Sequence, residues 1–241
     1  MRLQQYMDEV QQVMELERTQ RFLTLFHRAK LTYHDDGTRL AAEGWDTPWQ
    51  VLISTIMSAQ NRDESTIVTA EALFDKYPDL ESLASAEFED VYEVLSSINY
   101  NKSKSDYVIT SAQRLVETYG GSVPNDIDEL LTLKGVGRKT ANLVLSEVFE
   151  EPAICVDTHV HRLANVFDLV NADKRDGSEG STEKQLQTVA PEDFWRHINR
   201  YFVLWGQHVP GEDKARLLSA LEPLPNCFSL GADPLYLPED V

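Results

Sequence analysis

The chain has 241 residues, enough for one large or two small globular domains with a hydrophobic core. It carries 40 acidic against 22 basic residues, and 42% of its residues are hydrophobic, which excludes a disordered acidic chain. Two cysteines, Cys155 and Cys227, are too few for a disulfide framework and indicate a reducing compartment. The first residues hold no signal-peptide core and no apolar run is long enough to span a membrane, so we expect a cytoplasmic protein.

The net charge of −18 argues against a nucleic-acid partner at ordinary ionic strength, because phosphate binding normally uses a basic surface. At ~1 M salt, however, the Debye length is only about 3 Å, and the repulsion between the protein and DNA would be screened. We interpret the acidity as halophilic adaptation, with an acidic surface of no special meaning as the alternative. Residues 95–141 depart from the acidic bias, since their basic and acidic side chains nearly balance.

Apolar residues recur at three- and four-residue spacing along almost the whole chain, which predicts an all-α fold. One helix is expected to begin at Pro48, with Thr47 as its N-cap and Gln50 closing a capping box. This helix is apolar on most sides from Val51 to Met57 and should lie deep in the core. The polar stretch 171–181 is expected to be a surface loop.

The segment LTLKGVGRKTANLVL places two glycines one residue apart between two predicted helices. We expect the first helix over about 127–133, a turn at 134–137, and a second helix from about Arg138. Glycines permit a tight turn, and the backbone N–H groups at the start of the second helix can bind a phosphate oxygen without reading sequence. Such a turn is weak evidence alone, because the glycines could equally serve only the packing of a helical corner.

Together with VDTHVHRLANVF, VLISTIMSAQNRD and INYNKSK, this segment resembles the endonuclease III family of DNA glycosylase/AP lyases, with its helix-hairpin-helix and Gly/Pro…Asp signature. The resemblance covers roughly residues 45–170 and rests on several motifs in the same order. It implies two helical lobes. The first is a six-helix barrel over 47–157 that carries the hairpin at 134–137, and the second combines 1–46 with 158–241.

The resemblance implies that Lys139, just after the hairpin, attacks C1′ of the damaged nucleotide and forms a Schiff base, after which β-elimination breaks the strand. The positive end of the helix and neighbouring Arg138 disfavour the protonated amine, as a nucleophile requires. Asp157 is implied to stabilise positive charge on the sugar and to assist proton transfer. An ordinary surface lysine and an aspartate that only caps the helix from about Thr158 are the alternatives.

Reaction at C1′ requires the nucleotide to leave the base stack. The resemblance implies that Gln60 fills the gap and that Tyr100 is the wedge, where an aromatic ring can stack on the orphaned base. A helix-terminal Gln and a packed Tyr are the alternatives. Lys102 and Lys104 are expected to contact phosphate. The other predicted DNA contacts are Lys134, Gly135, Val136, Gly137, Arg138, Thr158 and His159.

Most members of this family bind a [4Fe–4S] cluster through four cysteines spaced C-x6-C-x2-C-x5-C. Here Pro210 stands about where the first ligand belongs and only Cys227 remains in the tail, so we expect no iron–sulfur cluster. The tail should be held by leucine packing instead (Leu217, Leu218, Leu221, Leu224 and Leu230). We expect no zinc site either, because His159 and His161 are two apart on a helix, and His197 and His208 lack evident partners.

The resemblance therefore implies a base-excision-repair DNA glycosylase with AP lyase activity on oxidised pyrimidines. Its expected partner is double-stranded DNA with a damaged base or an abasic site, bound by a monomer. One alternative is a monofunctional mismatch or adenine glycosylase, against which Gln60 and Lys139 argue. Another is a non-catalytic helix-hairpin-helix DNA-binding protein, which the joint presence of Lys139 and Asp157 disfavours.

Overall fold

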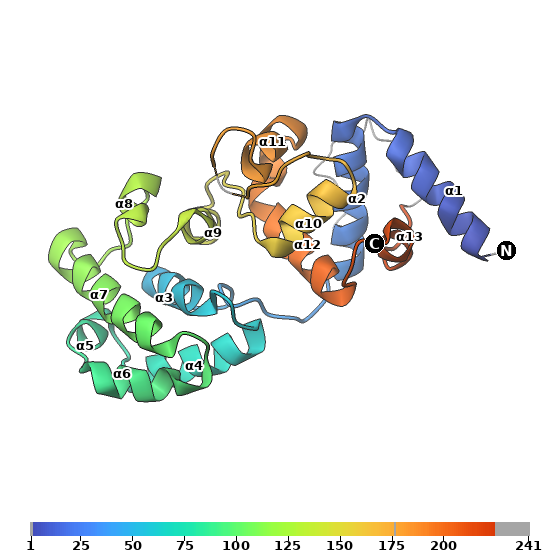
Figure 1. The fold of residues 1–241 in the computed structure, drawn as a ribbon. Coiled ribbons are helices and arrows are strands. Elements are labelled where there is room, and N and C mark those ends of the chain that lie inside the picture. The colour runs from blue at the N-terminus through green and yellow to red at the C-terminus, as the bar shows by residue number, and fades with distance from the viewer. Residues whose placement is uncertain (1, 176, 225–241) are drawn as a thin grey trace. The chain divides into compact units, whose positions relative to one another are not determined.

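A computed structural model describes residues 2–175 and 177–224 of the chain. Over these residues the secondary structure is helical with no strand, which confirms the predicted all-α class. The chain divides into two compact units, Arg39–Ala153 and the combination of Met1–Thr38 with Ile154–Val241. Figure 1 is coloured by residue number, so the helices of the first unit run from light blue to yellow-green, and those of the second are dark blue or yellow to red. This division groups Asp157 with the two terminal segments rather than with the hairpin. Within the described residues, no helix combines the length and apolar character needed to cross a lipid bilayer.

The unit 39–153 is built around α3, a short apolar helix that packs against α4, α7 and α9. The side chains of Leu52, Ile53 and Met57 on α3 are fully buried, as predicted. The helices of this unit are α3 (Pro48–Ser58), α4 (Asp63–Lys76), α5 (Leu80–Ala84), α6 (Phe88–Val94), η1 (Leu95–Ser97), α7 (Asn101–Tyr119), α8 (Ile127–Leu131) and α9 (Arg138–Phe149).

The start of α3 follows the predicted capping box. Gln50 Oε1 accepts hydrogen bonds from the backbone N of Thr47 at 3.1 Å and from its Oγ1 at 2.9 Å. Pro48 occupies the first turn, where its missing N–H costs nothing. The local pattern therefore sets where this central helix begins.

The other unit is built around α12, which packs against α2 and α10 and buries a cluster of aromatic rings. Phe26 and Phe194 meet edge to face with 4.9 Å between their centroids, and Trp205 is fully buried beside Phe167 and Phe202. Its helices are α1 (Arg2–Glu15), α2 (Arg18–Tyr33), α10 (Thr158–Val166), α11 (Thr182–Val189), η2 (Glu192–Phe194), α12 (Trp195–His208) and α13 (Lys214–Ser219). The described residues of 171–181 lie outside any helix, as expected for a loop.

The segment after α12 is held by leucine packing and by two side-chain donors. Leu217, Leu218 and Leu221 are buried, as predicted, but Leu224 is only partly buried; Leu230 and Cys227 lie outside the described residues. Trp205 Nε1 donates to the carbonyl of Leu217 at 3.1 Å. The buried guanidinium of Arg28 donates to the carbonyls of Leu218 and Leu221 at 3.1 and 2.9 Å, which caps the end of α13.

Candidate active site

The glycine hairpin joins α8 to α9, and the start of α9 agrees with the prediction, whereas the end of α8 does not. Helix α8 ends at Leu131, two residues earlier than expected, and α9 begins at Arg138 as expected. Gly135 has φ +81°, a conformation that L side chains rarely adopt. Gly137 is the N-cap of α9 in an extended conformation, φ −101°. The two glycines therefore differ in role: Gly135 permits the left-handed turn, and Gly137 begins α9 without a side chain that could crowd the helix start.

Three side chains of α7 support this hairpin. A Cβ placed on Gly135 would lie 2.7 Å from Cδ2 of Tyr107, so the tyrosine ring packs directly on the glycine backbone. Ser111 Oγ donates to the carbonyl of Lys134 at 2.9 Å, and Asp106 forms a 2.7 Å ion pair with Lys134 Nζ. The hairpin conformation thus depends on α7 as well as on its own glycines.

The predicted DNA contacts of the hairpin differ in how accessible they are. Lys134, Gly135 and Gly137 are exposed, whereas the side chain of Val136 is buried in the hydrophobic core of its unit. The backbone N of Val136 donates to the carbonyl of Leu133 at 3.2 Å, so neither its side chain nor its N–H is open to a phosphate, and the structure does not support the predicted contact of Val136.

Lys139 lies in the first turn of α9 with its side chain exposed. In the part of the chain that the structure describes, its amine has no hydrogen bond or ion pair. The next two residues, Thr140 and Ala141, are buried and anchor this turn. The amine is therefore carried on a fixed backbone and is open to a ligand.

Asp157 is the N-cap of α10, as predicted. Its Oδ1 accepts a 2.8 Å hydrogen bond from the backbone N of Val160, and its side chain is partly exposed. Because the cap uses Oδ1, the carboxylate is held in one orientation while Oδ2 remains available. Capping and a catalytic role are thus compatible in this geometry.

Gln60 and Tyr100 are exposed residues in two loops of the same unit, and both adopt left-handed backbone conformations with φ +58° and +59°. The two loops are joined by amide hydrogen bonds. Asn61 Oδ1 accepts from the backbone N of Asn99 at 2.8 Å, and Asn99 Nδ2 donates to the carbonyl of Gln60 at 2.9 Å. The structure therefore brings together the two residues that were predicted to fill the gap left by a flipped base.

The predicted phosphate contact of Lys104 is wrong, because this residue is buried, with only 3% of its surface exposed. Its Nζ donates to the carbonyls of Met57 and Ala59, at 2.7 and 2.6 Å, at the end of α3. Burial lowers the pKa of Lys104 to about 8. Lys102, by contrast, is exposed, as a phosphate contact requires.

Thr158 is exposed at the start of α10, and the half-buried ring of His159 packs against α12, where a Cβ on Gly206 would lie 2.6 Å from its Nδ1. His161 points to a different helix, since its Nδ1 lies 2.7 Å from Oγ1 of Thr182 on α11. Burial, reinforced by Arg175, lowers the pKa of His161. The two histidines do not converge, as predicted.

The polar contacts of His197 and His208 become visible only in the structure. His208 Nδ1 lies 2.9 Å from the hydroxyl of Tyr33, and Arg196 Nε donates to His197 Nε2 at 3.0 Å. One nitrogen of each ring thus makes a polar contact, with a tyrosine in one case and an arginine in the other. Within the described ranges, no group of three His, Cys, Asp or Glu residues could hold a metal ion.

The segment around Pro210 does not fit a [4Fe–4S] cluster, which needs four ligands. The sequence has two cysteines, and Cys155 is buried in the unit core. The guanidinium of Arg162 occupies the turn after α12 and donates to the carbonyls of Gly206, Val209 and Gly211. A side-chain cation thus stabilises the turn where the family pattern would place the first ligand.

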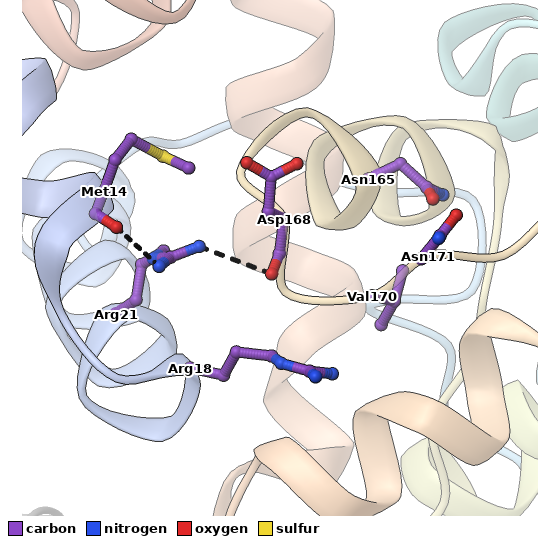
Figure 2. Close-up of a pocket in the computed structure, with 7 residues that line it drawn as sticks. All are labelled: Met14, Arg18, Arg21, Asn165, Asp168, Val170 and Asn171. Atoms are coloured by element: carbon purple, nitrogen blue, oxygen red, sulfur yellow. Dashed lines mark hydrogen bonds between the residues drawn. The ribbon is translucent and has the colours of Figure 1, made fainter.

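A cavity of about 600 Å³ lies in the unit that contains the termini, apart from the predicted site residues. Figure 2 shows the seven residues that line it: Met14, Arg18, Arg21, Asn165, Asp168, Val170 and Asn171. The guanidinium of Arg21 donates to the carbonyls of Met14 and Phe167, at 2.7 and 2.9 Å. Arg21 therefore stabilises the wall of this cavity through backbone contacts.

Sequence reasoning missed the residues that support the site: Asn61, Asn99, Asp106, Tyr107 and Ser111. One signal was available in the sequence. Lys104, Tyr107 and Ser111 are spaced at i, i+3 and i+7 and therefore share one face of α7. That stripe combines a cation, a ring and a hydroxyl on a face that packs inward.

Residues 53–192 match the model of the HhH-GPD superfamily of base excision DNA repair proteins. The chain is 41% identical over 162 residues to Endonuclease III of Thermotoga maritima, covering 67% of this chain and 74% of that protein. It is 35% identical over 166 residues to Endonuclease III of Synechocystis sp., covering 68% and 74%. Among solved structures, a trapped Endonuclease III–DNA covalent intermediate superposes with a TM-score of 0.72 at 30% identity, covering 82% of this chain and 91% of that one.

Proposed function

Because this chain belongs to the endonuclease III family of base-excision-repair DNA glycosylases, we propose that it excises oxidised pyrimidines from double-stranded DNA and then cleaves the strand as an AP lyase. The observation that carries the proposal is the exposed amine of Lys139, fixed in the first turn of α9 directly after the glycine hairpin. A relative of known structure was trapped as a covalent intermediate with DNA, which supports covalent chemistry in this family.

In the proposed reaction the unprotonated Nζ of Lys139 attacks C1′ of the damaged nucleotide. The bond between C1′ and the base breaks, the base leaves with a proton, and opening of the sugar ring gives a Schiff base on Nζ. Removal of a proton from C2′ then expels the 3′ phosphate oxygen and breaks the strand. Water finally hydrolyses the Schiff base and releases Lys139.

Asp157 is proposed to stabilise the positive charge that develops on the sugar and to carry protons between these steps. Its support is the capping bond to Val160, which fixes the carboxylate while leaving the side chain partly exposed. A carboxylate held in one orientation need not reorganise during the reaction, and this is how electrostatic stabilisation becomes effective.

DNA is proposed to be held mainly through its backbone. The exposed backbone of Gly135 and Gly137, at the N-terminus of α9, offers N–H groups to a phosphate, with Lys134, Arg138 and Lys102 as further contacts. Thr158 and His159 are proposed contacts at the start of α10. Gln60 and Tyr100 are proposed to fill the space that the flipped nucleotide leaves.

We further propose that the protein acts as a monomer without an iron–sulfur cluster and is adapted to high salt. Two cysteines cannot supply four ligands, and a net charge of −18 repels DNA unless salt screens it. Excision by the purified protein should therefore persist or rise between about 0.1 M and about 2 M potassium chloride. Loss of activity over that range would contradict the halophilic interpretation.

Borohydride trapping on a duplex with one abasic site tests the proposed chemistry. Borohydride reduces a Schiff base to a stable amine, so the wild-type protein should form a covalent adduct and Lys139→Gln should not. Lys184→Gln, the same change at an exposed lysine of α11, is the matched control and should form the adduct. No adduct with the wild-type protein would support the monofunctional or non-catalytic alternatives. A panel of duplexes with thymine glycol, dihydrouracil or uracil then identifies the preferred base.

A further inference from the structure

The loops that carry Gln60 and Tyr100 are held in conformations that their own residues disfavour. Four described residues other than glycine have positive φ, and two of them are Gln60 and Tyr100. An L side chain in this region crowds its own backbone, so the conformation persists only where surrounding contacts impose it. The amide pair of Asn61 and Asn99 is one such contact, but it lies near the surface.

The contact beneath this pair is the ammonium of Lys104. It donates to the carbonyls of Met57 and Ala59, the last turn and the C-cap of α3, and Asn61 Nδ2 donates to the same carbonyl of Met57 at 2.8 Å. Lys104 itself lies one turn into α7, whose N-cap is Tyr100, and its backbone N bonds the carbonyl of Tyr100 at 3.0 Å. One residue therefore connects the end of α3, which leads into Gln60, with the start of α7, which follows Tyr100.

A charged donor suits this position for a physical reason. The C-terminus of a helix carries partial negative charge on carbonyls that have no partner within the helix, and a cation there forms charge-assisted hydrogen bonds. Lys104 is the one buried lysine among the described residues. Its burial is tolerated because two carbonyl oxygens replace water around the ammonium.

We propose that Lys104 is a positioning residue for base flipping, whose buried ammonium holds the Gln60 and Tyr100 loops in the arrangement that fills the gap in the duplex. The inference rests on the roles proposed above for Gln60 and Tyr100. Lys104 does not touch DNA in this proposal. It removes the need to order two strained loops at the moment when the nucleotide leaves the stack.

A duplex with 2-aminopurine opposite a tetrahydrofuran abasic analogue provides a direct readout. This analogue cannot form a Schiff base, so the experiment reports loop insertion separately from chemistry at Lys139. Stacking of Tyr100 on the orphaned 2-aminopurine should change its fluorescence when wild-type protein binds. In Lys104→Met, which keeps the length of the side chain but removes the cation, we expect duplex binding within about threefold of wild type and loss of the fluorescence change. Single-turnover excision should fall by about 10²-fold, as expected when reacting groups are misplaced by about 1 Å.

Arg28→Met is the matched control. Arg28 is also a buried cation that caps the C-terminal carbonyls of a helix, but it does so at α13 in the other compact unit. Arg28→Met should lower the melting temperature of the protein and leave the fluorescence change of the bound duplex intact. Lys104→Arg should restore part of the signal, because it returns the charge.

Asn99→Ala gives a second test that does not depend on a buried site. Asn99 is exposed, so the variant is expected to fold, and it removes the bond to the carbonyl of Gln60. A reduced fluorescence change in Asn99→Ala supports the proposal even if Lys104→Met does not fold. A full wild-type signal in folded Lys104→Met overturns the role of Lys104, and a full signal in Asn99→Ala overturns the premise that the two loops must be held together for insertion. A wild-type protein that binds the duplex without any fluorescence change overturns both. Borohydride trapping of the wild type on a true abasic site decides the proposed lyase function independently of these results.

Discussion

The ring of Tyr107 on α7 occupies the space into which a side chain at Gly135 would project, with Cδ2 only 2.7 Å from a Cβ built on that glycine. A helix remote from the hairpin in sequence thus determines which residue the turn can accept. The left-handed backbone conformation at this position, with φ of +81°, also favours glycine over any residue with a side chain. Glycine at 135 is required twice, once by the backbone and once by the neighbouring ring.

Gly135→Ala should therefore be destabilising by about 2–4 kcal/mol, because it adds both backbone strain and a clash with an aromatic ring. Gly137→Ala is the matched control, since nothing lies within 4 Å of a Cβ at that position and its φ is −101°. Its stability should stay within about 1 kcal/mol of wild type. Urea denaturation followed by circular dichroism measures both. Equal losses in the two variants would show that the ring contact does not matter.

The two roles of Asp157 can be separated by substitution. Asparagine is as good an N-cap as aspartate but carries no charge, so Asp157→Asn should keep the stability of the wild type and slow excision by about 10²-fold. Asp157→Ala should in addition lose about 1 kcal/mol of stability. Asp213→Asn makes the same change at the N-cap of α13, where Asp213 accepts from Ala215 and Arg216, and should retain activity. Full activity of Asp157→Asn under single-turnover conditions would show that Asp157 only caps α10 and has no role in the reaction.

The ion pair between Asp106 and Lys134 limits how strongly the hairpin can bind phosphate. Asp106→Asn removes a negative charge and releases Lys134, so the Kd for an undamaged duplex should fall about two- to fivefold. The slope of log K against log salt should steepen by about one unit. Asp90→Asn makes the same charge change at the exposed pair of Asp90 with Lys76, in the same unit, and is the control. An equal effect in both variants would assign the gain to net charge alone.

Stability should depend on the protonation of His27, whose ring is buried against Phe26 and Phe194. Burial, with a smaller contribution from Lys30, lowers the pKa of His27 to about 4, against about 6.5 in the unfolded chain. Between these values the unfolded state binds more protons, so the stabilisation is complete above about pH 6.5 and is lost as pH falls toward 4. The loss is on the order of 2–3 kcal/mol.

His27→Phe should remove this part of the pH dependence, measured as the difference in unfolding free energy between pH 7 and pH 5. The exposed His34 offers the control, because His34→Phe should leave the pH dependence of the wild type in place. If the unfolding free energy of His27→Phe changes with pH as much as that of the wild type, other groups cause the acid sensitivity.

Short-range patterns determined much of this protein from the sequence alone. The all-α class, the capping box at Thr47, the N-cap at Asp157 and the start of α9 at Arg138 all depend on residues within one or two turns of one another. Helical periodicity and capping preferences are local, so a single sequence displays them. The motif order that led to the family was likewise readable without coordinates.

Only the tertiary structure decided which residues hold the site in place. Lys104 resembles any exposed lysine in the sequence, but the structure buries it against the end of α3, whose residues lie 45 and 47 positions away along the chain. Tyr107 against Gly135 and Arg28 against the end of α13 are further contacts between residues far apart in the sequence. The sequence shows what each side chain can donate or fill, whereas the partner that receives it is determined by how the helices pack, because such contacts form between segments that no local pattern connects.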